Sequence, residues 1–236
     1  MKSAAFSPAR WSLRLSATWR WYRCRTEWRA DMGLFPIFLK LAGRMVLVVG
    51  GGTVAEAKIQ GLLAAGAGIR VVAPQITPQI AEWVRLGRIE WLPRTFAPDD
   101  LLGSHMVIAA TSAPGVNNTV FREAEARRIL CNAVDDNKNC HFYYGAVVRR
   151  GDLQIAISTN GKSPALAHRL RKELERAYGE EYAAWLDFLG AARDLLRANA
   201  SDPEEAKAIL HQLASRESFE TFLRESSGGQ RQKEVA

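Results

Sequence analysis

The chain has 236 residues, of which 47% are hydrophobic and 24% are charged, a balance typical of a soluble globular protein. Its length suits one large domain or two small ones, and it is long enough to bury a sizeable core. No run of about eighteen apolar residues occurs, so the sequence predicts no membrane-spanning helix.

The net charge of +7 is concentrated in residues 1–31, which hold seven Lys and Arg against two acids, together with four of the seven Trp. A basic, Trp-rich leader could serve as an arm for a membrane surface or a nucleic acid. It lacks the continuous apolar core of a secretory signal. Because Met32 stands directly before the first patterned segment, we favour a poorly ordered tail or a start codon placed too early. We therefore expect no nucleic-acid and no membrane partner.

Short apolar strands alternate with helical patterns along residues 32–145. The expected strands are 45–49, 69–73, 89–92, 106–110 and 129–134. The expected helices are one that follows three glycines and runs to Ala65, with Val54, Ile59, Leu62 and Leu63 on one face, and two more at 77–86 and 117–128. This alternation predicts an α/β fold with a Rossmann-type, doubly wound parallel sheet.

The pattern changes after residue 145. Strands are expected at 146–148 and 153–158, around a turn at 149–152. A helix then begins with Ser163 as N-cap and Pro164 at its first position. Residues 180–224 look helical throughout, with a capping box at 201–204, and a frayed tail is expected from Ser226. These patterns divide the chain into a leader (1–31), a Rossmann domain (32–145), a small α+β segment (146–179), a helical domain (180–225) and a tail (226–236).

The glycine triplet follows the first strand and opens the first helix. The spacing Gly-x-Gly-x-x-Gly fits Gly50 and Gly52, with Ala55 in the third place. A helix N-terminus presents unpaired amides and a partial positive charge, and glycine lets the backbone approach a pyrophosphate closely. The strand–turn–helix context predicts a nicotinamide dinucleotide site, whose turn also includes Gly51.

The second strand ends in Ala73-Pro74-Gln75, where a dinucleotide-binding domain usually carries Asp or Glu for the ribose hydroxyls. We expect the backbone around Pro74 and Gln75 to hold the ribose instead. The absence of a basic residue at this strand end favours NAD over NADP. Thr111, in the turn after the strand 106–110, is a further expected cofactor contact.

Asp135 and Asp136 follow the last strand of the sheet, at the edge where doubly wound folds bind their ligands. An aspartate here could act as a base or bind a cation. A turn-forming pair of Asp residues is the alternative.

A polar loop containing Gly and Lys separates the strand 153–158 from the helix that Ser163 caps. Its candidate binding residues are Ser158, Thr159, Asn160, Gly161, Lys162 and Ser163. Basic residues flank it, namely Arg149 and Arg150 before the loop and Arg169, Arg171 and Lys172 after it. Each alone fits a solvated surface, but together they indicate a ligand with several carboxylates or phosphates.

Five ordered motifs resemble the N-terminal module of the sirohaem synthases, over residues 33–190. They are Phe-Pro-Ile-Phe-Leu at 35–39, Val-Leu-Val-Val-Gly-Gly-Gly-Thr-Val-Ala-Glu at 46–56, Val-Ala-Pro at 72–74, Asn-Ala-Val-Asp-Asp at 132–136 and the segment 154–167. Members of that family are precorrin-2 dehydrogenases, and some are also sirohydrochlorin ferrochelatases. The resemblance implies the oxidation of precorrin-2 with NAD, and Fe²⁺ as a substrate where chelation occurs.

The resemblance also implies residue roles. Thr53, Val54, Pro74 and Gln75 match the family's NAD contacts, and Asp135 matches the aspartate thought to serve both reactions. Residues 158–163 match the tetrapyrrole loop, in which Thr159 stands where members carry Ser or Thr. The family further implies a homodimer built through 146–179 and a helical part over the active-site cleft. Members often carry Gly where Asn160 stands and Pro where Asn137 and Gly145 stand, so Asn160 could alter the loop.

Two other function classes remain open on the residues alone. A nucleotide-sensing Rossmann regulatory domain has the same glycine turn but would not need the loop 158–163. A nucleic-acid binder would depend on the basic leader. Three cysteines without framework spacing favour a reducing cytoplasm. The pair Cys140-His141 near Cys131 fits no common zinc pattern, so we expect no metal site there and a polar loop or core role for His141.

Overall fold

The computed structural model describes residues 33–233, with side chains as far as residue 226. The chain divides into two units, residues 1–36 and 37–236. In the first unit only residues 33–36 are described, and they form neither helix nor strand. The predictions for the leader 1–31 fall outside the described residues. Everything below concerns the second unit.

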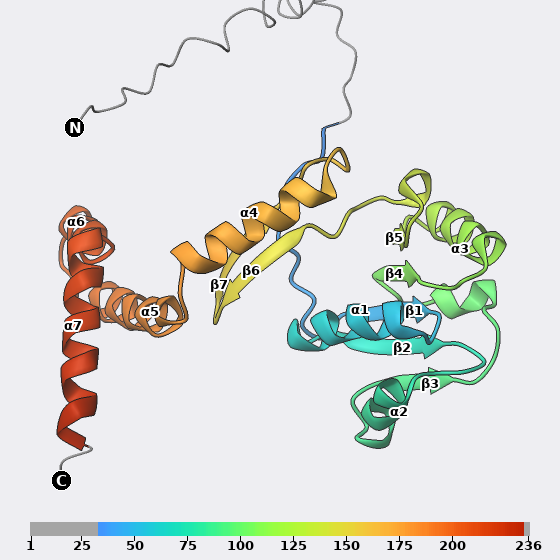
Figure 1. Ribbon diagram of the computed structural model, residues 1–236, viewed down its shortest axis with the longest axis horizontal. Coiled ribbons are helices and arrows are strands. Elements are labelled where there is room, and N and C mark those ends of the chain that lie inside the picture. The colour runs from blue at the N-terminus through green and yellow to red at the C-terminus, as the bar shows by residue number, and fades with distance from the viewer. Residues whose placement is uncertain (1–32, 234–236) are drawn as a thin grey trace, which may run out of the picture. The chain divides into compact units, whose positions relative to one another are not determined.

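A five-stranded parallel sheet forms the first part of this unit (Figure 1). Its strands are β1 (Met45–Val49), β2 (Gly68–Val72), β3 (Glu90–Leu92), β4 (Met106–Ala109) and β5 (Leu130–Ala133). Their order is β3-β2-β1-β4-β5, so the chain runs outward from β1 to one edge and then returns to build the other. Every neighbouring pair is parallel. The predicted doubly wound Rossmann-type fold is confirmed.

Both faces of the sheet are covered by helices, and this explains the uninterrupted apolar strands. Val46 and Val48 pack in a cluster with side chains of α1 (Thr53–Ala64) and α2 (Pro78–Arg85). Leu47 and Val49 point to the other face, in a cluster with side chains of α3 (Pro114–Ala126). Since successive strand residues alternate between faces, each must be apolar where both faces are buried.

Two helices differ in detail from the sequence prediction. On α1 the buried residues are Ala55, Ile59 and Leu62, whereas Val54 is 44% exposed. One residue along a helix is a rotation of about 100°, so placing Ala55 against the sheet turns Val54 outward. Helix α3 begins at Pro114 rather than at 117, because proline is well suited to the first helical position.

An antiparallel hairpin and a helix follow the sheet. Strands β6 (Ala146–Arg150) and β7 (Leu153–Ile157) pair with Ala146 opposite Ile157, and α4 (Pro164–Ala177) packs on β6. The turn is shorter than predicted, because Arg149 and Arg150 belong to β6. Ser163 caps α4 as predicted, accepting a hydrogen bond from the Leu166 amide at 3.2 Å.

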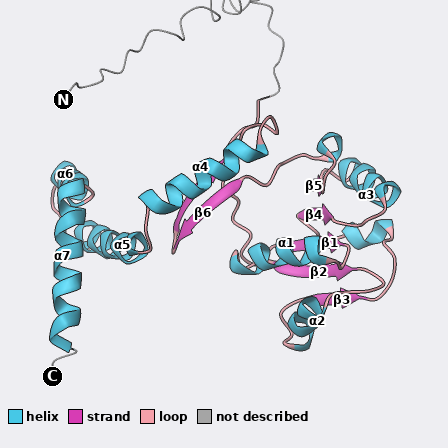
Figure 2. Ribbon diagram, in the orientation of Figure 1, coloured by secondary structure: helices cyan, strands magenta, loops and turns pink. Residues whose placement is uncertain are grey.

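The remaining helices are α5 (Glu181–Asn199), α6 (Pro203–Leu213) and α7 (Arg216–Lys233), which contact one another (Figure 2). The capping prediction at 201–204 was wrong in its cap residue: Asp202, not Ser201, accepts from the Glu204 amide at 2.9 Å. A frayed tail was expected from Ser226, but helix α7 continues to Lys233. Once a helix has formed, each further residue adds one backbone hydrogen bond, even where its helix propensity is poor. Within the described residues, no helix is long and apolar enough to cross a membrane.

The glycine turn brings the end of β1 against the strands on both sides of it. Gly50 has a φ of 120°, and a Cβ there would overlap the carbonyl of Ala110. A Cβ on Gly51 would overlap the carbonyl of Gln75. By contrast, nothing lies within 4 Å of a Cβ on Gly52. The first two glycines are therefore required by the fold itself, and the third leaves open space.

We predict that Gly51→Ala lowers the free energy of unfolding by about 1–3 kcal/mol, because the backbone of the turn must move away from Gln75. Gly52→Ala is the matched control and should cost under about 1 kcal/mol, the difference between two uncharged helix N-caps. Urea unfolding of the two variants beside the wild type measures both values. Equal stabilities for the two variants would contradict the close approach at Gly51.

Candidate functional site

The N-terminus of α1 is open to an anionic ligand. Gly52 is its N-cap and supplies no side-chain cap, and the amides of Thr53 and Val54 belong to the first turn, where helices offer no internal acceptor. The empty space over Gly52 allows a group to approach this backbone closely. The exposed side chain of Val54 stands beside it. These features fit the pyrophosphate of a dinucleotide.

The segment after β2 packs directly onto the glycine turn. The Thr77 amide donates to the Gly51 carbonyl at 2.9 Å, and the Thr77 hydroxyl donates to Glu56 at 2.6 Å. Between β2 and Thr77 lie Pro74 and Gln75, and no acidic side chain stands in that stretch. The backbone at Pro74 and Gln75 is therefore beside the turn, where an adenosine ribose would lie in this fold.

Thr111 follows β4 and is held by a residue that the sequence analysis did not single out. The buried Asn117 accepts from the Thr111 amide at 3.2 Å and from its hydroxyl at 2.7 Å, and it donates to the Thr111 carbonyl at 3.0 Å. This fixes the turn after β4 at the same edge of the sheet as the glycine turn. A polar side chain in the first turn of α3 was the available signal.

The two aspartates after β5 have separate roles. Asp136 caps the short helix at 137–139, accepting from the Lys138 amide at 3.2 Å and from Asn139 at 2.6 Å. Asp135 has a φ of 61°, and within the described part of the chain no hydrogen bond or salt bridge holds its carboxylate. The turn-forming interpretation therefore applies to Asp136, while Asp135 is exposed and available for chemistry. Backbone strain of this kind is common at functional sites.

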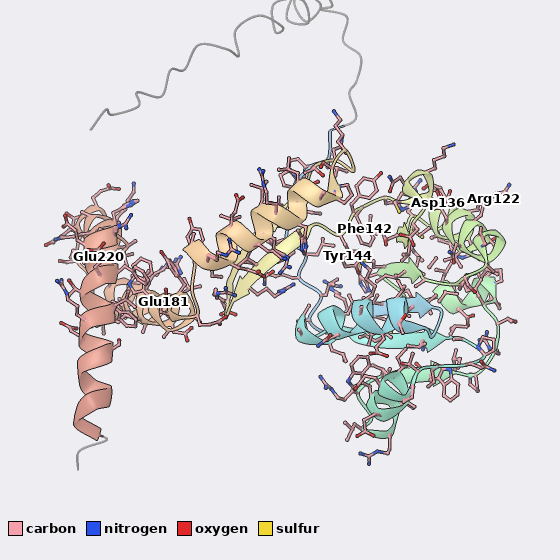
Figure 3. All side chains as sticks on the ribbon, viewed as in Figure 1. Arg122, Asp136, Phe142, Tyr144, Glu181 and Glu220 are labelled. Carbon is pink, nitrogen blue, oxygen red and sulfur yellow. The ribbon has the colours of Figure 1, made fainter. Side chains whose placement is uncertain are left out.

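Cys140 and His141 connect the segment after β5 to neighbouring elements. Asn132 pairs with Cys140 as an isolated antiparallel bridge, and the Cys131 amide donates to the His141 ring at 3.0 Å. The other ring nitrogen of His141 contacts Glu125. Together these contacts fasten the segment after β5 to that strand and carry the chain to Tyr143 and Tyr144. Figure 3 labels Tyr144 on this segment, between β5 and β6.

A cavity of about 430 Å³ lies between the Rossmann domain and the loop 158–163. Its lining includes Lys58 of α1, Asp135, Tyr143, Tyr144, Ser158, Thr159, Gly161 and His168. Of these, Asp135, Ser158, Thr159 and Gly161 were predicted from the sequence, whereas Lys58, the two tyrosines and His168 were not. The cavity is large enough to take part of a macrocyclic ligand, and it offers one carboxylate and several hydroxyl groups.

The loop 158–163 is shaped by its own hydroxyl groups. The Asn160 amide donates to the Ser158 hydroxyl and the Ser163 amide to that of Thr159, each at 3.2 Å. Asn160 takes a left-handed φ of 52°, which asparagine tolerates, so the replacement of glycine is accommodated. Asn160, Lys162 and Ser163 are not among the residues that line the cavity.

Most of the basic residues expected around the loop have partners within the protein. Arg150 donates to the carbonyls of Tyr178 at 2.8 Å and Glu175 at 2.9 Å, and so holds the end of α4. Arg169 and Arg171 form ion pairs one helical turn along α4, with Glu173 and Glu175. The sequence could not show these pairings, because they depend on distances between side chains. The interpretation of these basic residues as an anion-binding surface stays a prediction.

Lys58 supplies the positive charge instead. Its ammonium lies 3.8 Å from the centroid of the Tyr144 ring, a cation–π contact. Partial burial lowers the pKa of Lys58, and the nearby Asp135 carboxylate acts in the opposite direction. The cavity therefore contains one cation and one carboxylate that are close enough to interact. Lys58 sits one turn into α1, and the helical pattern alone gave no reason to separate it from a solvated face.

Comparison with known proteins places this geometry in a family. Residues 37–146 match a family model described as "Putative NAD(P)-binding", and residues 150–177 match one described as "Sirohaem biosynthesis protein central". Siroheme synthase 3 of Aeromonas hydrophila is 41% identical over 77% of this chain and 39% of its own length. Siroheme synthase 1 of Serratia proteamaculans is 44% identical over 61% of this chain and 30% of its own length. The chain thus spans about two fifths or less of these relatives.

A solved structure covers much more of the chain. The precorrin-2 dehydrogenase SirC superimposes with a TM-score of 0.71 at 30% identity, over 85% of this chain and 100% of SirC. A doubly wound sheet with an open glycine turn defines a dinucleotide-binding protein of Rossmann type. Within that class, the chain belongs to the sirohaem synthase N-terminal module family, as its sequence motifs implied.

The buried thiol of Cys131 gives a pH-dependent prediction. Burial raises the pKa of Cys131 from 9.0 to about 12, with a smaller contribution from Cys140. The folded state prefers the neutral thiol, so the stabilisation is complete below about pH 9 and is lost as the pH rises toward 12. We expect the free energy of unfolding to decrease between about pH 8 and pH 10, and to decrease less in Cys131→Ala than in the wild type. Urea unfolding at each pH measures both values. Equal losses would contradict this prediction.

Proposed function

We propose that this chain is an NAD-dependent precorrin-2 dehydrogenase that forms sirohydrochlorin in sirohaem biosynthesis. The observation that carries the proposal is the position of two features at one edge of the sheet. The open glycine turn follows β1, and Asp135 follows β5 and lines the cavity. The similarity to a precorrin-2 dehydrogenase over its whole length supports the same activity here.

The cofactor-binding residues in this proposal surround the glycine turn. Gly50, Gly51 and Gly52 let the backbone approach the pyrophosphate, and the amides of Thr53 and Val54 donate to it. The backbone at Pro74 and Gln75 holds the adenosine ribose, and Thr111, fixed by Asn117, borders the nicotinamide side. When bound, NAD⁺ supplies the hydride acceptor.

Asp135 handles the proton in this mechanism. Oxidation of precorrin-2 removes two electrons and two protons, of which a hydride leaves for the cofactor and one proton remains to be transferred. The exposed Asp135 carboxylate, which has no hydrogen bond within the described residues, accepts that proton as a general base. The protein accelerates the reaction by placing this base at the same edge of the sheet as the bound dinucleotide.

The tetrapyrrole lies in the cavity in this proposal. Ser158, Thr159 and Gly161 line it, and their hydroxyl and backbone groups can meet the substrate's polar edge. Asn160, Lys162 and Ser163 keep the loop in shape through backbone amides that donate to Ser158 and Thr159. We further propose the predicted division at residues 145, 179 and 225, a homodimer built through β6 and β7, and a cytoplasmic location.

We predict that Asp135→Asn abolishes most precorrin-2 oxidation, by about a hundredfold to ten-thousandfold, because a general base is lost. NADH binding, followed by fluorescence, should stay near the wild-type value because Asp135 is outside the glycine turn. Asp136→Asn is the matched control, because asparagine still offers a side-chain oxygen to cap residues 137–139. Oxidation by Asp135→Asn at nearly the wild-type rate would rule out the assignment.

We also propose that the same cavity inserts Fe²⁺ into sirohydrochlorin, with Asp135 accepting the pyrrole protons. The wild type should then accelerate metallation by Fe²⁺ or Co²⁺, followed by the absorbance of the macrocycle, and Asp135→Asn should reduce that rate to the uncatalysed level. Metallation at the uncatalysed rate with the wild type would leave dehydrogenation as the sole activity of this site.

A further inference from the structure

One cation reaches the cavity, and it comes from the dinucleotide-binding helix rather than from the loop. Among the described residues that line the cavity, Lys58 is the sole Lys or Arg. Three arginines of β6 and α4 have partners within the protein: Arg150 binds the carbonyls at the end of α4, and Arg169 and Arg171 pair with Glu173 and Glu175. Lys162, a candidate binding residue of the loop, does not line the cavity. An anionic ligand inside the cavity therefore meets Lys58.

The surroundings of Lys58 hold the ammonium without neutralising it. The side chain is half-buried, and its nitrogen lies 3.8 Å from the Tyr144 ring centroid. Within the described part of the chain, no carboxylate lies within salt-bridge distance of it, although Asp135 is near enough to interact electrostatically. An aromatic face stabilises a cation but leaves its N–H donors free on the other side.

The energetic balance favours a ligand that brings its own negative charge. Burial lowers the pKa of Lys58, which means that the protein withdraws water from the ammonium without fully replacing it. A carboxylate that enters the cavity restores this lost solvation by a charge-assisted hydrogen bond. Asp135 stands in the same cavity and repels a second carboxylate, so the two side chains together favour one orientation of a polycarboxylate ring.

We propose that Lys58 binds a carboxylate of the tetrapyrrole. This contact would orient the ring toward Asp135 and toward the edge of the sheet where the dinucleotide binds. The inference rests on the proposed function and names a substrate-binding residue within that site. Because Lys58 projects from α1, the helix whose N-terminus meets the pyrophosphate, one element would hold both the cofactor and the substrate.

The test compares Lys58→Gln and Lys58→Arg with the wild type and with Lys207→Gln, a control on α6 whose lysine pairs with Glu204. Sirohydrochlorin affinity is measured by absorbance titration and NADH affinity by fluorescence. Lys58→Gln should weaken sirohydrochlorin binding by about tenfold to a hundredfold, the loss of one charged hydrogen bond. NADH binding should be unchanged, Lys58→Arg should recover most of the affinity, and Lys207→Gln should bind like the wild type.

Kinetics add a readout that a merely structural role would not move. In precorrin-2 oxidation, Lys58→Gln should raise KM more than it lowers kcat. The wild-type kcat/KM should fall at high pH as the ammonium of Lys58 deprotonates. Arginine keeps its charge throughout that range, so Lys58→Arg should extend the plateau to higher pH.

The outcomes separate this inference from the proposed function. If the wild type binds sirohydrochlorin but does not oxidise precorrin-2, the proposed dehydrogenase activity is contradicted. The role of Lys58 is then still decided by the sirohydrochlorin affinities of its variants. Unchanged sirohydrochlorin affinity in Lys58→Gln overturns the inference. Equal loss of NADH and sirohydrochlorin binding in both Lys58 variants also overturns it, since that result assigns Lys58 to the stability of α1. A wild type that binds no sirohydrochlorin overturns both proposals.

Discussion

The turn from β1 into α1 can form only because Gly50 and Gly51 have no side chains. At Gly50 and Gly51 the backbone touches the carbonyls of Ala110 and Gln75, which belong to the connections after β4 and β2. This contact brings the ends of β1, β2 and β4 together, and the first turn of α1 lies at the same edge of the sheet. Ala55 then packs against the sheet, and its burial fixes the rotation of α1 that carries Lys58 to the cavity. A single steric constraint thus sets both the phosphate-binding turn and the direction of a side chain one helical turn further on.

Charge in the cavity is sparse, and several ionisable groups near it have partners within the protein. Asp136 caps a short helix, His141 fastens the segment after β5, and Arg150 holds the end of α4. The cavity itself is lined by Asp135 and Lys58, together with His168, two tyrosines and the hydroxyls of Ser158 and Thr159. A polycarboxylate substrate would therefore be oriented by a few specific charges rather than by a broad basic surface. This arrangement suits a reaction in which a proton acceptor must face one particular edge of the macrocycle.

The sequence predicted the parallel sheet because strands buried on both faces are continuous apolar runs, and Met45–Val49 is such a run. It also predicted the glycine turn and Asp135, since each directly follows a strand at the carboxyl edge. The choice of Asp135 over Asp136 came from the family resemblance, because the physical difference between them lies in hydrogen bonds that Asp136 makes to the chain beyond it. The sequence could not identify Lys58 or show that Arg171 is paired, because the pairing of a cation depends on distances between side chains. The capping box at 201–204 was predicted from residue types, which cannot show that Asp202 is the residue that accepts from the Glu204 amide.

The central claim is that the glycine turn and the Asp135 cavity form one catalytic cleft. The most direct test is the stoichiometry of one reaction, with wild-type protein, precorrin-2 and NAD⁺ mixed under anaerobic conditions and both chromophores followed by absorbance. If the two features form one cleft, sirohydrochlorin and NADH appear together in equal amounts, at a rate proportional to the protein concentration. Formation of neither product above the rate without protein, while NADH still binds, would contradict it and would favour a domain that senses a nucleotide.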